Sequence, residues 1–132
     1  MNSILDLVQN PANAPLISTV RKFSVNAFPP GFLDDNPDAS MWVVDIEYRG
    51  ENSWAVVHHG EVYDKNFVGE YEPLPSSRTK KFKKRFRHDL PTAVDIAEEL
   101  ARTVTMMGMD WEGFMKWSEA KDAEKAAKAA AE

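Results

Sequence analysis

The chain has 132 residues, of which 43% are hydrophobic and 28% are charged, and it contains no cysteine. This length and composition are typical of one globular domain, and the lack of cysteine excludes disulfides, a cysteine nucleophile and thiolate metal sites. No apolar run reaches the roughly 18 residues of a membrane span, and residues 1–15 do not have the pattern of a signal peptide. We therefore expect a soluble protein of the cytoplasm, with no membrane among its partners.

The first half of the chain has the pattern of β-strands. Residues 1–15 suggest only a short helical arm that ends in a proline-containing loop. Four later segments are rich in alternating or β-branched residues and predict strands, namely residues 19–28, 41–49, 53–64 and 69–72. A Gly-Glu-Asn turn joins the second and third segments as a hairpin, and Gly60 marks a bulge or bend inside the third.

The second half changes to helical spacing after Pro75. The signals for helix starts, in chain order, are Ser76 or Ser77, Asp89 and Asp110. Pro91 in the first turn supports the second start, because proline is tolerated there. The helix from Asp89 carries one apolar stripe, and Gly108 separates it from the third helix. Trp111 and Trp117 cannot both face the body from that third helix, so we expect Trp117 to be partly exposed.

Strands followed by helices indicate the α+β class. We predict a three- to four-stranded antiparallel meander, followed by two to three helices packed on one face of the sheet. Residues 1–118 are assigned to this single domain. Residues 119–132, rich in Ala, Lys and Glu, are assigned to a helical tail. Trp117 and this tail are a candidate surface for homo-oligomerisation.

The most unusual feature of the sequence is the basic segment, residues 78–88. Seven of its residues are basic and none is acidic, namely Arg78, Lys80, Lys81, Lys83, Lys84, Arg85 and Arg87. The other nine basic residues of the chain stand against 21 acidic ones, a balance of −12. On a helix, Phe82 and Phe86 form an apolar ridge that docks onto the sheet. The cations are then either a solvated face, neutralised by the rest of the chain, or an anion-binding surface.

No motif of catalysis or cofactor binding is present, since Gly-x-Ser-x-Gly, the P-loop, Gly-x-Gly-x-x-Gly and His-Glu-x-x-His are all absent. His58 and His59 are adjacent on a predicted strand, so their side chains should leave opposite faces and share no metal without a bulge. The carboxylates in or beside the strands read as an acidic solvent face; they are Asp45, Glu47, Glu61, Asp64, Glu70 and Glu72. We assign no catalytic residue, no metal ligand and no cofactor.

The run Tyr-Glu-Pro-Leu-Pro-Ser-Ser-Arg at residues 71–78 resembles small uncharacterised accessory proteins of actinobacterial phages and related bacteria. The resemblance covers about residues 42–108. It implies a small phage accessory protein in the cytoplasm of a bacterial host, and it implies no activity and no functional residue. After this run the relatives tend to continue with acidic and Trp-containing segments, whereas this chain continues with basic residues. The positive charge is therefore a specialisation of this protein.

From these features we expect a non-enzymatic binding module that engages a host macromolecule through the basic segment. A host protein with an acidic face ranks first as the partner, because the acidic remainder of the chain opposes general binding to a phosphate backbone. Nucleic acid bound through its phosphates is the alternative. A small enzyme with a carboxylate and histidine site on the sheet is the second alternative.

Overall fold

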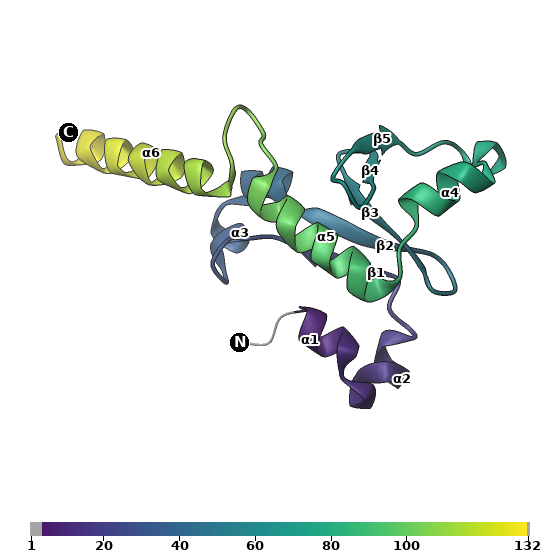
Figure 1. Cartoon of the computed structure of the whole chain (residues 1–132). Coiled ribbons are helices and arrows are strands. Elements are labelled where there is room, and N and C mark those ends of the chain that lie inside the picture. Colours follow the sequence, from purple (N-terminus) through teal and green to yellow (C-terminus); the bar gives the residue numbers. More distant parts are fainter. Residues whose placement is uncertain (1–3, 132) are drawn as a thin grey trace.

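The computed structural model describes residues 4–131 and shows one antiparallel sheet with helices on both of its faces (Figure 1). Five strands follow one another across the sheet in chain order. They are β1 (Lys22–Val25), β2 (Val44–Gly50), β3 (Ser53–His58), β4 (Glu61–Tyr63) and β5 (Gly69–Tyr71). The α+β class and the meander are confirmed.

The sheet has one strand more than the sequence predicts, because the run 53–64 folds back on itself. His59 and Gly60 both have a positive φ, 50° and 80°, and they form a two-residue turn in which His58 pairs with Glu61. The bulge or bend expected at Gly60 is therefore a hairpin turn. It splits the run into β3 and β4.

The helices within residues 4–131 are α1 (Ile4–Gln9), α2 (Ala14–Ile17), α3 (Phe32–Asp35), α4 (Lys80–Phe86), α5 (Leu90–Thr103) and α6 (Trp111–Ala131). Three short 3-10 turns join them to their neighbours, namely η1 (Pro11–Asn13), η2 (Pro37–Trp42) and η3 (Pro75–Ser77). None of the helices in this range combines the length and the apolarity that crossing a bilayer requires.

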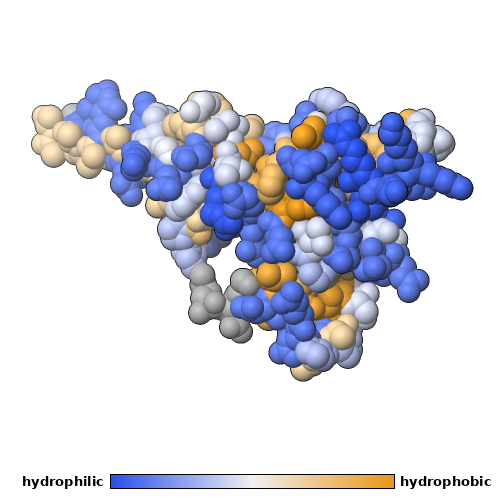
Figure 2. Space-filling view, viewed as in Figure 1, coloured by the Kyte–Doolittle hydropathy of each residue, from blue (hydrophilic) through white to orange (hydrophobic). Residues whose placement is uncertain are grey.

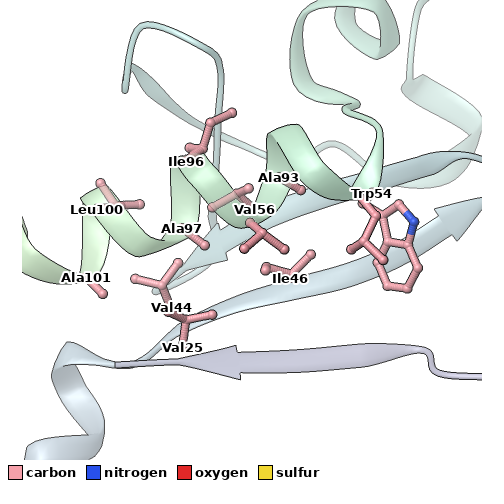
Figure 3. Close-up of a cluster of buried hydrophobic side chains, with 12 residues drawn as sticks. Val25, Val44, Ile46, Trp54, Val56, Ala93, Ile96, Ala97, Leu100 and Ala101 are labelled. Carbon is pink, nitrogen blue, oxygen red and sulfur yellow. The ribbon is translucent and has the colours of Figure 1, made fainter. Parts of the chain in front are cut away.

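The main core lies between α5 and one face of the sheet (Figure 3). Asp89 caps α5 as predicted, because its Oδ1 accepts a hydrogen bond from the backbone N–H of Thr92 at 2.9 Å. The apolar stripe of α5 then covers Val44, Ile46 and Val56, all of which are fully buried. Each such side chain contributes about 1.5–3 kcal/mol through burial.

The opposite face of the sheet carries α4. Along β3, Val56 points to α5, whereas Ala55 and Val57 point to the other side, where they form a separate cluster with Phe82 and Phe86. The prediction that the helices pack on one face is therefore wrong for α4. The cause is the extended link between the two helices, in which the backbone of His88 pairs with that of Trp54 in β3. The chain crosses the sheet edge at this point, so the helices before and after it take opposite faces.

A second apolar cluster joins α3, η2 and the first turns of α6. Its buried members are Phe28, Ala39, Trp42 and Phe114. Trp42, which the sequence places on a strand, ends η2 instead, and its Nε1 donates to the carbonyl oxygen of Met109 at 2.8 Å. The residue is still fully buried, as expected for a core tryptophan.

The predicted third helix and tail form one continuous helix, α6. Asp110 caps it, because its Oδ1 accepts from the backbone N–H of Gly113 at 2.8 Å. Phe114 and Ser118 are its buried residues, and residues 119–131 are exposed throughout. In Figure 1 this part of α6 projects away from the sheet. Trp117 is 45% exposed, which confirms its predicted partial exposure, while self-association through it stays a prediction.

Candidate anion-binding site

The basic segment folds into α4 and the extended residues that flank it. Thr79 caps the helix, since its Oγ1 accepts from the backbone N–H of Phe82 at 3.1 Å. The predicted caps, Ser76 and Ser77, lie in η3 instead. The rings of Phe82 and Phe86 are 4.8 Å apart, and Phe86 is fully buried against the sheet, which confirms the predicted ridge. The space-filling view shows hydrophilic side chains gathered over the outside of α4 (Figure 2).

Arg85 leaves α4 toward the acidic residues beside β4 and β5. Its Nε donates to Oδ2 of Asp64 and its Nη1 to Oε1 of Glu70, each at 2.9 Å. Burial raises the pKa of Asp64, but this effect is outweighed by hydrogen bonds from backbone N–H groups and from Arg85, so the pKa lies below its usual value. Arg85 therefore ties α4 to the end of the sheet.

Glu72 lies among three guanidinium groups. Nη2 of Arg49 donates to its Oε1 at 2.7 Å, and Nη2 of Arg87 donates to its Oε2 at 2.6 Å. Nη2 of Arg78 is 3.5 Å from Oε1. The side chains of these four residues are only 10–19% exposed. Glu72 is thus the carboxylate around which the arginines from β2 and from both ends of the basic segment are arranged.

The charges within this group are not balanced. Burial raises the pKa of Glu72, but hydrogen bonds from Arg49 and Arg87 and the charges of both outweigh it, so the carboxylate stays ionised. Burial lowers the pKa of Arg87; Glu72 opposes this effect, while the charges of Arg49 and Arg78 add to it. The guanidinium groups therefore repel one another, and a further anion close to them is electrostatically favoured.

The four lysines of the basic segment behave differently from its arginines. They are Lys80, Lys81, Lys83 and Lys84, and all four are exposed. The ion pairs of residues 4–131 include Arg78, Arg85 and Arg87 but none of these lysines. The arginines are thus used within the fold, whereas the lysine charges point to solvent. The sequence alone did not distinguish the two sets.

A hollow of about 370 Å³ opens where α4 meets the β2–β3 hairpin, and we call it the arginine hollow. It is lined by Arg49, Ser53, Pro75, Arg78, Lys83, Lys84 and Arg87. No carboxylate and no aromatic ring is among these residues. Glu72 contacts three of the lining arginines without lining the hollow itself. The volume lies within the roughly 300–1,000 Å³ of small-molecule sites.

The structure gathers only part of the predicted site into this hollow. Four of the seven predicted residues line it, while Lys81 and Arg85 line a smaller hollow beside Glu70, and Lys80 lines neither. Arg49 and Ser53 were missed by the sequence analysis. Arg49 lies on the polar face of β2, in phase with Asp45 and Glu47, and this alternation was the one signal that could have suggested it.

The expected acidic solvent face is instead an ion-pairing face. Lys22 pairs with Asp45 at 3.4 Å, and Arg49 pairs with Glu47 at 3.3 Å as well as with Glu72. Glu70 pairs with Arg85 while half exposed, whereas Asp64 and Glu72 are largely buried and serve as counter-charges of arginines. Their role is thus inside the fold.

The histidines do not leave opposite faces as predicted. Because His59 lies in the turn, its Nε2 reaches the carbonyl oxygen of Met41 at 3.2 Å, and Nε2 of His58 reaches the same atom at 2.8 Å. Neither ring hydrogen-bonds a carboxylate among the described residues. Within residues 4–131, no group of three or more His, Asp or Glu is placed to hold a metal ion.

Another hollow, of about 410 Å³, lies between α1, β1, α5 and the start of α6. It contains Glu98 and Arg102 but no histidine and no cluster of like charges. Arg102 is paired with Glu99 at 2.7 Å. This hollow therefore offers less chemistry than the arginine hollow, although it is slightly larger.

Comparison with protein-family models, with curated proteins and with solved structures finds no match to this chain. The candidate site is therefore interpreted from its own chemistry. Residues with three guanidinium groups, two of the four free ammonium groups of α4 and a hydroxyl line one hollow. Donors of these kinds are able to bind an anion.

Proposed function

We propose that this protein is a non-enzymatic binding module, which holds an acidic face of a partner protein against the outside of α4. The observation that carries the proposal is the division of the basic segment. Its arginines are paired within the fold, while its four lysines are exposed and make no ion pair among the described residues. Clustered like charges on one short helix disfavour that helix. A partner with carboxylates opposite the lysines removes this penalty.

A protein fits the surface better than a nucleic acid does. Single-stranded nucleic acids bind by stacking bases on aromatic rings between basic residues. In α4 the rings are not available for stacking, because Phe86 is buried and the guanidinium groups of Arg85 and Arg87 lie over Phe86 and Phe82, at 4.6 and 5.6 Å from the ring centres. The balance of −12 in the rest of the chain also opposes a long phosphate backbone.

Exposed apolar residues occur in the chain just before the basic segment. Tyr71 is 78% exposed and Leu74 is 75% exposed. Leu74 directly precedes Pro75, which lines the arginine hollow. Protein interfaces combine such apolar and aromatic anchors with a charged rim. This combination supports a protein partner.

The biological setting that we propose rests on the resemblance of the 71–78 run to phage accessory proteins. Glu72, Pro75 and Arg78 of this run belong to the arginine hollow or to its carboxylate centre. The run thus supplies part of the scaffold of the site in this chain. We place the protein in the cytoplasm of a bacterial host, where it engages a host protein.

The test compares partner recovery by two variants of equal charge. In the first, Lys80, Lys81, Lys83 and Lys84 are changed to Glu, and in the matched control the four lysines of α6 are changed instead, namely Lys116, Lys121, Lys125 and Lys128. Each immobilised chain is incubated with an actinobacterial lysate treated with nuclease, and bound proteins are quantified by mass spectrometry. We expect the first variant to lose the specific partner and the control to retain it.

Two outcomes contradict the proposal. Equal recovery by both variants would remove the lysines of α4 from any interface. A partner recovered from untreated lysate but not from the nuclease-treated lysate, together with direct DNA binding that weakens by about 0.9 log units per tenfold salt for each phosphate contacted, would favour the nucleic-acid alternative.

A further inference from the structure

The arginine hollow has hydrogen-bond donors that the fold itself does not use. Nη1 of Arg78, Nε of Arg87 and Oγ of Ser53 make no hydrogen bond among the described residues, and neither does Nζ of Lys83 or Lys84. None of these five atoms is buried away from water, so each has access to solvent. The hollow therefore presents free donors from three chain segments.

The guanidinium groups are held in place before any ligand arrives. Nε of Arg78 donates to the carbonyl oxygen of Pro73 at 2.8 Å, and Arg87 donates through Nη1 to the carbonyl oxygen of Phe86 and through Nη2 to Glu72. Fixed side chains lose little conformational freedom when a ligand binds. The arginines are thus a preorganised base, while Lys83 and Lys84 at the rim are free to adjust.

The hollow keeps a surplus of positive charge. Five cations line it, and the carboxylates paired with them are Glu72 and Glu47, which leaves an excess of three. One phosphate group of charge −2 does not neutralise this surplus, and it also fills only part of about 370 Å³. A ligand that matches the site is compact and carries at least three negative charges.

We propose that the arginine hollow binds an oligophosphate, a ligand with two or more adjacent phosphoryl groups. Arginine forks and lysine ammonium groups together are the side chains that proteins use for phosphates. Adjacent phosphoryl groups supply the required charge within a small volume. Because Pro75 is the only lining residue with neither a charge nor a hydroxyl, recognition rests on the phosphate chain. This inference goes beyond the proposed function, since the ligand is a small molecule and no partner protein is needed.

The experiment measures binding by isothermal titration calorimetry at low ionic strength, on the full chain. The probes are inorganic phosphate, pyrophosphate, tripolyphosphate, ATP, citrate and an oligo-aspartate peptide. Two double variants of α4 carry the same charge change. Lys83→Gln/Lys84→Gln removes both lysines that line the hollow, and Lys80→Gln/Lys81→Gln removes two that do not.

We expect tripolyphosphate to bind more tightly than phosphate and more tightly than citrate. The variant at Lys83 and Lys84 should lose roughly tenfold or more in affinity, because one charge-assisted hydrogen bond contributes about that factor. The variant at Lys80 and Lys81 should lose less than about threefold, as expected for surface charges outside the site. ATP should bind about as well as tripolyphosphate, because the lining offers no ring for the base.

Several results would overturn the inference. They are no binding of tripolyphosphate, citrate binding as tight as tripolyphosphate, and an equal loss in both variants. A preference of roughly tenfold for ATP, which is the worth of one stacked base, would contradict recognition through the phosphate chain. Binding of the oligo-aspartate peptide without tripolyphosphate would reject the oligophosphate and leave the proposed protein partner standing.

Discussion

The two faces of the sheet are held by different interactions. The face under α5 is an apolar core, in which Val44, Ile46 and Val56 are fully buried against one helix. The face under α4 has a smaller apolar cluster, and arginine–carboxylate pairs at Asp64 and Glu72 add to it. One face of the sheet is thus covered by apolar packing alone, and the other by a smaller apolar cluster together with ion pairs.

This difference bears on function. Partly buried ion pairs add little net stability compared with well-packed apolar side chains of the same volume, because each charge must first be desolvated. The α5 face shows that this chain can cover its sheet without charges. The charged face carries the fixed guanidinium groups and the free lysines on which the proposed function rests.

The largest effect should come from removing the carboxylate centre of the charged face. Glu72→Gln leaves the guanidinium group of Arg87 without its counter-charge and that of Arg49 with Glu47 alone, while both side chains remain largely buried. We expect the free energy of unfolding to fall by about 2–3 kcal/mol, as for the loss of one member of a partly buried charge network. Urea denaturation monitored by tryptophan fluorescence measures it.

The matched control for this variant is Glu70→Gln. Glu70 also accepts a hydrogen bond from an arginine of the basic segment, but its side chain is 50% exposed, so water replaces the lost partner. The loss should be clearly smaller than for Glu72→Gln. Equal losses would show that Glu72 is not the centre of this face.

A smaller effect should appear where the two faces meet, at His88. The residue is 4% exposed; its Nε2 donates to the carbonyl oxygen of Tyr63 at 2.9 Å, and its Nδ1 has no partner among the described residues. Burial lowers the pKa of His88 below its usual value of 6.5, despite the carbonyl partner that raises it, and burial also lowers the pKa of His58. Below pH 6.5 the unfolded chain then binds more protons than the folded chain, so stability falls as the pH decreases.

The histidine effect can be separated from that of the carboxylates by the pH range. Asp64 and Glu72 have lowered pKa values, so their contribution is present above the ordinary values of 3.8 and 4.5 and is lost only below them. Between pH 6.5 and about 5, the change of the unfolding free energy with pH comes from the protonation of histidines. His88→Gln should flatten this slope. An unchanged slope in His88→Gln would contradict a neutral, buried His88.

Features that depend on neighbours in the chain could be predicted from the sequence. The cap of α5 at Asp89 and the docking ridge of Phe82 and Phe86 follow from spacings of three and four residues. The partial exposure of Trp117 follows from helical geometry in the same way. Each of these depends on one element alone.

Features that depend on which strand or helix lies opposite could not be predicted in this way. Arg49 and Glu72 are 23 positions apart, and their contact depends on how β2 and the segment after β5 lie in the folded sheet. As long as the sheet face that α4 occupies is unknown, the sequence does not separate the paired arginines of the basic segment from its free lysines. The turn at His59 was missed for a related reason, because a non-glycine residue with positive φ has no strong sequence signal.

The arginines of the basic segment hold the fold, whereas its lysines do not. The most direct test is the urea unfolding free energy of the variant in which Lys80, Lys81, Lys83 and Lys84 are all changed to Gln. These lysines make no ion pair among the described residues, and their removal relieves repulsion between like charges. We predict a stability equal to that of the unmodified protein within about 0.5 kcal/mol, or slightly higher. A loss of more than about 1 kcal/mol would show that the lysines are structural, and would contradict the account.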